Sequence, residues 1–250
     1  MVLLHATVGK RAPYQANRVL ALLRKMFNLA KIWGLFSGDN PVTGIEKFKE
    51  EKRERFVEEY ELPRLFAAIA EEVNVRVQKI IMISLLTGAR RTEVLSMRWE
   101  DLNFSARTWR IGKTKNGQPH LLPIPAPVIS ILSQLPRESH NPYVFPSVTG
   151  EGHVVNIKRA WNRIRRKARL EDVRFHDLRR TCGSWMANQG VPLQVIGKVL
   201  NHAQINTTEI YARLILDPQR KALDGNAERM LAIGKHETVS GPAIGIKAAV

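Results

Sequence analysis

Two histidines, two arginines and a tyrosine stand within residues 176–211, at spacings that suit phosphate chemistry. His176 and Arg179 are three positions apart, so they share one face if the segment is helical. A helix start just before Tyr211 would place that hydroxyl on a short helix, and His202 falls in the turn before it. If the fold brings these side chains together, the site is cationic and free of metal.

Such a set suits the breaking of a phosphodiester without a metal ion. Arginine holds non-bridging oxygens well because its planar fork makes bidentate contacts. A tyrosine hydroxyl can attack in line, and its ordinary pKa of about 10 means that it gains from nearby positive charge. Since the sequence has no clustered carboxylates typical of a two-metal site, a metal-dependent nuclease is the least favoured class.

Arg90 stands where an apolar helix is expected to stop. Residues 76–87 are largely apolar and predict a buried helix, which Gly88 ends before a new helix starts. An arginine beside a buried helix is costly unless it is paired or faces a ligand. Arg90 is therefore a site candidate, and Glu93 is placed to orient it.

A β-hairpin is predicted in the middle of the chain. Strand-like runs at 107–111 and 120–124 flank an Asn-Gly pair, which is typical of hairpin turns. Lys115 would lie at the tip, where a lysine can donate a proton to a leaving oxygen. Lys113 stays open as an alternative.

The charge of the chain favours a polyanionic partner. There are 39 Lys and Arg against 23 Asp and Glu, a net charge of +16, and the pI is about 10.4. Nucleic acid is favoured over a membrane, because the sequence has no apolar run long enough to span one. The single cysteine, Cys182, excludes an internal disulfide and predicts a small core residue. A cytoplasmic protein associated with the nucleoid is expected.

One predicted helix, over 155–170, is exceptionally basic. It has an apolar stripe for packing and no acidic residue to balance its basic face. This pattern predicts contact with DNA phosphates. The candidate DNA-binding residues are Lys158, Arg159, Arg163 and Arg166.

The ends of the chain are less clearly patterned. Residues 1–14 predict a loop, and 15–34 predict an amphipathic helix. Residues 47–55 are dense in charge and typical of a solvated linker. Beyond Pro218 the pattern is lost, except for a few apolar residues that could dock on a neighbour.

In their order and separations, five pieces resemble the catalytic set of the tyrosine recombinases, or phage-type integrases. The pieces are TGARRTE at 87–93, GKTKNGQPHLLP at 112–123, HDLRRT at 176–181, LNH at 200–202, and Tyr211. Each piece alone is a weak signal, but the ordered combination is strong. The resemblance implies a mainly α fold with a small antiparallel β-sheet, and a tyrosine recombinase-like catalytic domain.

The resemblance implies a role for each matching residue. Arg90 and Arg179 would clamp the scissile phosphate, while His176 and His202 would hydrogen-bond it and assist proton transfer.

Tyr211 would be the nucleophile and would form a 3′-phosphotyrosyl link. Lys115 would protonate the leaving 5′ hydroxyl, and Glu93 would support Arg90. The link conserves the bond energy, so the reaction would need no metal, ATP or other cofactor.

The resemblance also divides the chain. A partial helical core-binding domain at 1–46, a linker at 47–55, a catalytic domain at 56–216 and a C-terminal tail at 217–250 are expected. The expected function is site-specific recombination that integrates or excises a prophage or genomic island. The implied partners are double-stranded DNA attachment sites, further copies of the chain in a homotetramer on DNA, and an accessory DNA-bending protein or directionality factor, with no membrane.

Two alternatives stay open. The short front region and the large basic charge also fit a DNA-binding remnant or regulator without strand exchange. A type IB topoisomerase uses similar chemistry to relax supercoils without a specific site.

Overall fold

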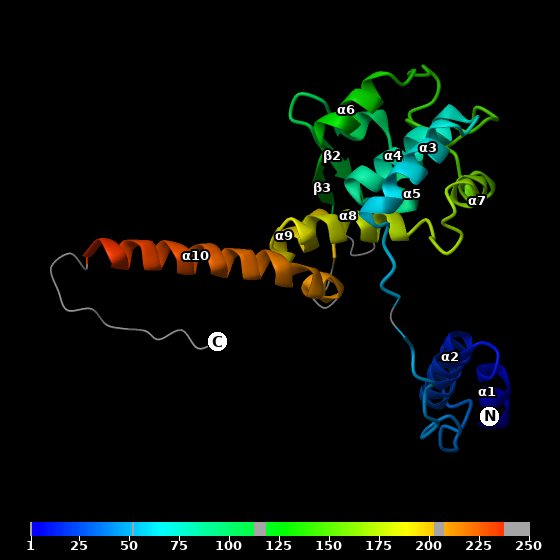
Figure 1. Cartoon of the computed structure of the whole chain (residues 1–250). Helices are drawn as coiled ribbons and strands as arrows, with labels where there is room; N and C mark the ends of the chain where they lie inside the picture. Colours follow the sequence, from blue (N-terminus) through cyan, green and yellow to red (C-terminus); the bar gives the residue numbers. More distant parts are fainter. Residues whose placement is uncertain (1, 52, 113–118, 203–207, 238–250) are drawn as a thin grey trace. The chain divides into compact units, whose positions relative to one another are not determined.

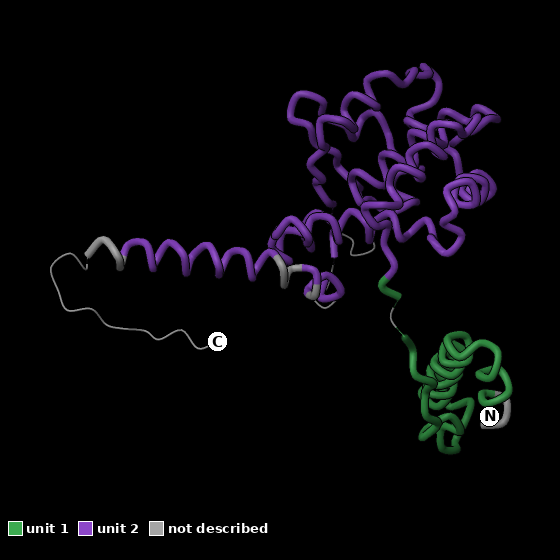
Figure 2. Tube along the Cα trace, viewed as in Figure 1, with its two compact units in different colours: residues 1–54 green, residues 55–250 purple. Residues whose placement is uncertain are grey.

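The chain forms two compact units. The computed structural model describes residues 2–51, 53–112, 119–202 and 208–237. Residues 1–54 form unit 1 and residues 55–250 form unit 2 (Figure 2). The division falls inside the segment that the sequence predicts as a linker.

Unit 1 holds two helices, α1 (Val2–Gly9) and α2 (Pro13–Ile32), which pack against each other. The amphipathic helix predicted over 15–34 is α2, displaced by two residues. The loop predicted over 1–14 is wrong for most of its length, because α1 occupies it. The apolar residues of α1 have no helical period, so tertiary contacts account for this helix: it packs on α2, and His5 stacks on the ring of Phe48.

The first residues of the charged segment 47–55 are hydrogen-bonded to α2. The side-chain amide of Asn17 donates to the carbonyl of Phe48 (2.8 Å) and its oxygen accepts from the Phe48 N–H (2.9 Å). The Tyr14 hydroxyl donates to the carbonyl of Glu51 at 2.6 Å. The first part of the predicted linker is therefore held on unit 1, where a solvated connector was expected.

Unit 2 is mainly helical with one small antiparallel sheet, which confirms the predicted fold class (Figure 1). Its helices are α3 (Leu62–Ala70), α4 (Val75–Thr87), α5 (Arg91–Leu95), α6 (Ala126–Ser133), α7 (Lys158–Lys167), α8 (Asp177–Asn188), α9 (Leu193–Val199) and α10 (Leu216–Glu237). Short 3-10 helices are η1 (Glu59–Glu61), η2 (Trp99–Asp101) and η4 (Glu209–Ile215).

The sheet has the order β1-β2-β3, with β1 (Leu102–Asn103), β2 (Thr108–Ile111) and β3 (His120–Pro123). Strands β2 and β3 are antiparallel, and Ile111 pairs with His120 at the end next to the connection between the two strands. These two strands are the arms of the predicted hairpin.

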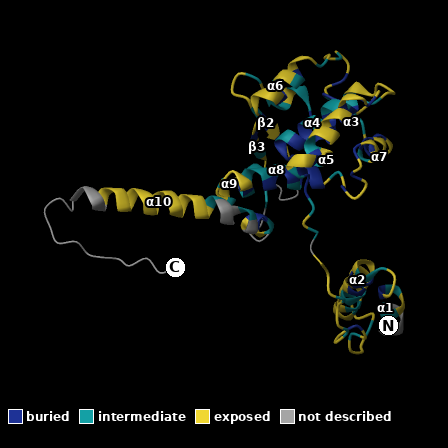
Figure 3. Cartoon of the chain, viewed as in Figure 1, coloured by how far each residue is buried: buried dark blue, intermediate teal, exposed yellow. Residues whose placement is uncertain are grey.

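Helix α4 is the centre of the core of unit 2. It packs against both α6 and α8, and most of its side chains are buried (Figure 3). Asn74 caps its start by accepting from the Val77 N–H at 3.2 Å. Its end is fixed by Gly88, whose φ of 65° is left-handed. The predicted buried helix and its stop are both found.

The chain enters unit 2 along helix α8. The N–H of Val57 donates to the Thr181 hydroxyl at 2.9 Å, and the Trp185 indole donates to the Val57 carbonyl at 3.1 Å. Arg55 makes a bidentate pair with Glu61 at 2.7 and 2.8 Å. Hydrogen bonds therefore hold the first residues of unit 2 against α8, the helix that carries Arg179.

The predicted patternless tail is wrong for its first part, since α10 is a long helix. Pro218 lies in its first turn, where a missing N–H costs nothing, so this proline does not stop the helix. Leu223, Met230, Leu231 and Ile233 are exposed on α10. None of the described helices combines the length and apolarity of a membrane span.

Candidate active site

Arg90 lies at the junction between α4 and α5, held by Glu93. One carboxylate oxygen of Glu93 accepts from the Arg90 backbone N–H at 2.7 Å, and the other pairs with the guanidinium at 2.8 Å. A second guanidinium nitrogen of Arg90 donates to the Asn201 carbonyl at 3.0 Å. Glu93 thus lies where the sequence expects a support for Arg90.

Arg179 lies on α8 and is only 5% exposed. Its guanidinium donates to the Gly88 carbonyl at 2.7 Å and also to the Leu200 carbonyl. Burial and the charge of Arg90 lower the pKa of Arg179 to about 10, so it still carries its charge at pH 7. Carbonyl oxygens compensate part of the cost of burying this cation.

The two arginines meet at the turn after α9. Asn201 has a left-handed φ of 50°, a conformation that asparagine tolerates better than most residues. Consecutive carbonyls, of Leu200 and Asn201, accept from Arg179 and Arg90 respectively. The turn therefore orients both guanidinium groups in one place.

His176 directly precedes the first residue of α8, on the same side as Arg90. A cavity of about 270 Å³ is lined by Arg90, Arg91, Thr92, Phe175 and His176. Burial, and then the charge of Arg179, lower the pKa of His176 below its usual value. The cavity is open and cationic, as a binding site for an oxyanion requires.

His202 lies in the turn between α9 and η4. Burial lowers its pKa to about 4, with further contributions from Arg179, Arg90 and His176. The imidazole is therefore neutral at pH 7, with one nitrogen that donates and one that accepts. Its Nδ1 is 2.9 Å from the Thr208 hydroxyl.

Tyr211 lies on η4 and is 2% exposed. Its ring lies against α8 at Gly183, where a Cβ would be only 2.5 Å from Cζ and 2.7 Å from the hydroxyl oxygen. Gly183 is one turn beyond Arg179, so the hydroxyl lies on the face of α8 that holds this arginine. The absence of a side chain at Gly183 makes this position possible.

The electrostatics of Tyr211 differ from the expectation. Burial raises its pKa to about 12, although Arg179 and Arg180 act in the opposite direction. The sequence suggests a gain from positive charge, but desolvation is the larger effect here. In this state Tyr211 is a buried neutral phenol.

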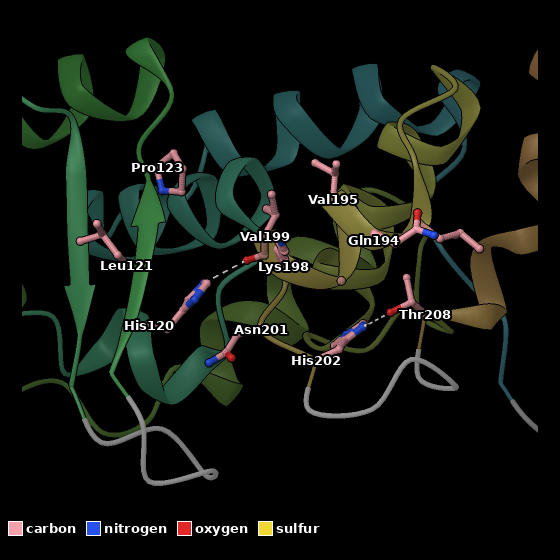
Figure 4. A pocket seen from close by; sticks show the side chains of 12 residues that line it. His120, Leu121, Pro123, Gln194, Val195, Lys198, Val199, Asn201, His202 and Thr208 are labelled. Carbon is pink, nitrogen blue, oxygen red and sulfur yellow. Dashed lines mark hydrogen bonds between the residues drawn. The ribbon is translucent and has the colours of Figure 1, made fainter.

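Lys115 and the alternative Lys113 lie outside the described residues. The strands that flank them are described, and His120 begins the second of these strands. His120 lines a cavity of about 810 Å³ together with His202 and Thr208 (Figure 4). Burial lowers the pKa of His120.

His120 and Thr208 were not identified from the sequence. His120 lies inside the recognised piece at 112–123, after the hairpin tip, and Thr208 lies just before Tyr211. Only their proximity to His202 in space makes them candidates.

The basic helix α7 is partly neutralised by two acids that directly follow α3. Arg163 makes two contacts with Glu72, at 2.5 and 3.2 Å, and the Glu72 side chain is only 3% exposed. Lys167 pairs with Glu71. Three of the four candidate DNA-binding residues of α7 are exposed and have no ion-pair partner among the described residues: Lys158, Arg159 and Arg166.

Within the described ranges, no group of three His, Cys, Asp or Glu side chains is arranged to hold a metal ion.

The structure brings together five of the residues singled out in the sequence: Arg90, His176, Arg179, His202 and Tyr211. Their catalytic roles stay predictions.

This fold and site belong to a known class. The family model described as the phage integrase family matches residues 55–215, well over half of the chain. The chain therefore belongs to the phage integrase family, the tyrosine recombinases, and the resemblance seen in the sequence is confirmed.

Several curated relatives match most of the chain. The shufflon-specific DNA recombinase of Escherichia coli is 29% identical over 211 residues, 81% of this chain and 52% of the relative. A tyrosine recombinase of Thermosipho africanus is 28% identical over 78% of this chain and 70% of its own length. The prophage integrase IntF of Escherichia coli is 28% identical, over 82% and 46%. The chain spans about half the length of the first and third of these relatives.

Solved structures support the fold. The XerH site-specific recombinase in a post-cleavage complex has a TM-score of 0.67 at 19% identity, covering 86% of this chain and 68% of that one. The Tn1549 transposon integrase with circular intermediate DNA has a TM-score of 0.70 at 16% identity, covering 88% and 82%.

Proposed function

We propose that the chain cleaves and rejoins DNA strands through a covalent link between Tyr211 and a 3′ phosphate. The observation that carries the proposal is the convergence of two arginines, two histidines and Tyr211 in one site. The relatives support it, since their names describe DNA recombinases and integrases.

In the proposed reaction, Arg90 and Arg179 hold the non-bridging oxygens of the scissile phosphate. Both are already oriented by carbonyl groups, so little reorganisation accompanies the build-up of charge. The Tyr211 oxygen forms a bond to phosphorus, the bond to the 5′ oxygen breaks, and Lys115 protonates that oxygen. Attack by a 5′ hydroxyl from another strand reverses these steps and joins the two strands.

His176 and His202 contribute hydrogen bonds to the phosphate and assist proton transfer. Both are neutral at pH 7, since burial lowers their pKa values. Tyr211 must leave its buried position to reach the phosphate. Its raised pKa means that attack requires transfer of the phenolic proton, which the neutral imidazole of His176 can accept, as the bond forms.

We also propose a role in integrating or excising a prophage or genomic island. Relatives named as a prophage integrase of Escherichia coli and the integrase of Salmonella phage P22 support this more specific assignment. The partners would be double-stranded attachment sites, with an accessory DNA-bending protein or directionality factor. The protein would act in the cytoplasm, at the nucleoid.

A homotetramer on two DNA sites is part of the proposal. Helix α10 supports it, because its exposed apolar residues would gain from burial against a second copy.

The test is covalent capture on DNA. Duplexes retained by the protein from a random pool are nicked, incubated with it in EDTA, and denatured. A DNA–protein adduct is expected with the native chain and should be absent in Tyr211→Phe. Tyr60→Phe is the matched control, because Tyr60 is exposed on the surface of unit 2 and should leave the adduct unchanged.

An adduct that persists in Tyr211→Phe would contradict the proposed nucleophile. DNA retention without any adduct would favour the DNA-binding regulator instead. Relaxation of any supercoiled plasmid, regardless of sequence, would favour the topoisomerase-like activity.

A further inference from the structure

The side chain of Thr208 contacts the imidazole of His202 inside the active site. Its Oγ1 is 2.9 Å from Nδ1, and the residue is only 2% exposed. Both side chains line the cavity between β3 and α9, and they point toward one another (Figure 4). The hydroxyl therefore meets the ring nitrogen in a place largely closed to water.

Two hydrogen-bond arrangements are possible between a hydroxyl and a neutral imidazole. Either Oγ1–H donates to an unprotonated Nδ1, or Nδ1–H donates to Oγ1. In the second arrangement the hydroxyl proton would need another acceptor, and the described contacts of Thr208 supply none. An unpaired buried donor costs about 1–3 kcal/mol, so the first arrangement is favoured.

The first arrangement decides where the imidazole carries its proton. If Nδ1 accepts, the proton is on Nε2. The neutral state is the relevant one, since burial, Arg179, Arg90 and His176 all lower the pKa of His202. His202 then offers an N–H donor and can hydrogen-bond a phosphate oxygen.

His120, in the same cavity, shows the contrasting case. Its Nε2 lies 3.3 Å from the Val199 carbonyl, which can only accept, so this nitrogen carries the proton (Figure 4). Its Nε2–H is thus used within the protein. The partner of each ring sets which nitrogen stays available.

The backbone of Thr208 has a second connection. Its carbonyl accepts from the N–H of Tyr211 at 3.0 Å, in the turn that begins η4. Gly197 leaves room for the hydroxyl, because a Cβ there would be 3.1 Å from Oγ1, and its carbonyl accepts from the His202 N–H at 2.9 Å. Thr208 thus connects the imidazole of His202 to the segment that carries Tyr211.

We propose that Thr208 is a positioning residue: its hydroxyl donates to Nδ1 of His202, which keeps the ring protonated on Nε2, and its backbone ties this ring to the helix of Tyr211. The inference rests on the proposed function, because His202 is assumed to hydrogen-bond the scissile phosphate. It adds a residue that does not itself touch DNA.

The first measurement is the rate of adduct formation in a single turnover with saturating protein. Thr208→Val keeps the shape but removes the hydroxyl, and the rate should fall roughly 10- to 100-fold, as for other residues that orient a functional histidine. Thr208→Ser should restore the rate to within about three-fold of the native chain, since it retains the donor. Thr108→Val, on β2, is the control and should not change the rate.

The second measurement is imidazole nitrogen NMR of the free protein near pH 7, which reports the tautomer of His202. The Nε2–H form is expected in the native chain and in Thr208→Ser, and a mixture in Thr208→Val. A merely structural threonine would change thermal stability without changing the tautomer.

The outcomes separate the two proposals. An Nδ1–H tautomer in the native chain, or an unchanged rate and tautomer in Thr208→Val, would overturn the role of Thr208. If the native chain forms no adduct, the proposed function fails, and the tautomer measurement still decides the hydrogen bond. If Thr208→Val does not fold, the tautomers of the native chain and of Thr208→Ser decide it.

Discussion

Helices α7 and α8 lie in the same unit but differ in the side chains they bury: the buried side chains of α7 are apolar, whereas α8 buries polar side chains beside apolar ones. Helix α7 turns apolar residues inward and basic residues outward. Helix α8 buries a set of polar residues: Asp177, Arg179, Thr181 and Ser184. The first is an ordinary amphipathic helix, and the second has polar chemistry in the interior.

The difference between the two helices shows that a polar side chain needs a hydrogen-bond partner when it is buried, as on α8, and not when it is exposed, as on α7. A buried polar group needs a partner, and Arg179 has the carbonyls of Gly88 and Leu200, while Thr181 donates to the Asp177 carbonyl at 2.8 Å. On α7, Arg163 pairs with the buried carboxylate of Glu72. Loss of one group on α8 should therefore change the geometry of the site, whereas loss on the outer face of α7 should change only attraction to DNA.

The largest effect is expected on α8. Arg179→Gln should lower the single-turnover rate of DNA cleavage at least about 100-fold, because it removes a preorganised cation that would hold the phosphate. The same substitution on α7, Arg159→Gln, should change that rate less than about three-fold at saturating protein, where binding is not limiting. The rate of adduct formation measures both effects. An equal loss of rate in the two variants would contradict the distinction drawn between α8 and α7.

A middle-sized effect is expected where α7 meets its buried acid. Glu72→Ala should lower the free energy of unfolding by about 1–3 kcal/mol, since the removed carboxylate is buried and charge-paired with Arg163.

The matched variant for this pair is Glu71→Ala, whose side chain is exposed and pairs with Lys167. It should stay within about 0.5 kcal/mol of the native chain. Urea unfolding measures both variants. A similar loss in the two would mean that burial of the acid is not the deciding factor.

The smallest effect per residue is expected on the outer face of α7. Replacing Lys158, Arg159 and Arg166 together with Gln should weaken DNA binding for all sequences alike. The slope of log affinity against log salt should become shallower by about 0.9 for each lost phosphate contact.

Arg163→Gln is the control for this surface. It should alter the salt slope less than any of the three, because Glu72 already neutralises this charge. Fluorescence anisotropy across a salt series measures both. An unchanged slope in the triple variant would remove α7 from the DNA interface.

The fold class followed from the sequence because the long apolar periods, the Asn-Gly hairpin and the glycine stops act locally. Helices α1 and α10 could not be predicted in the same way. The first depends on packing against α2, and the second has a proline, Pro218, which is harmless only because it lies in the first turn.

The candidate site was predictable as a set of residues, through the family resemblance, but not as an environment. Nothing local to Tyr211 indicates that Gly183, far away in sequence, leaves space for its ring. The pairing of Arg163 with Glu72 joins residues from distant segments for the same reason. Burial and pairing depend on the tertiary fold. Burial decides the pKa of Tyr211, and pairing decides whether an arginine on α7 is neutralised by an acid or stays available to bind DNA.

Gly88 illustrates how little freedom such a site leaves to mutation. Its backbone is left-handed, and a Cβ there would lie 2.5 Å from Leu200 Cδ2 and 3.2 Å from Cys182. Any amino acid that replaces it adds that atom, so this position has no conservative substitution. During evolution, the sequence around the junction of α4 and α5 can drift, while this glycine must be retained or replaced together with its neighbours.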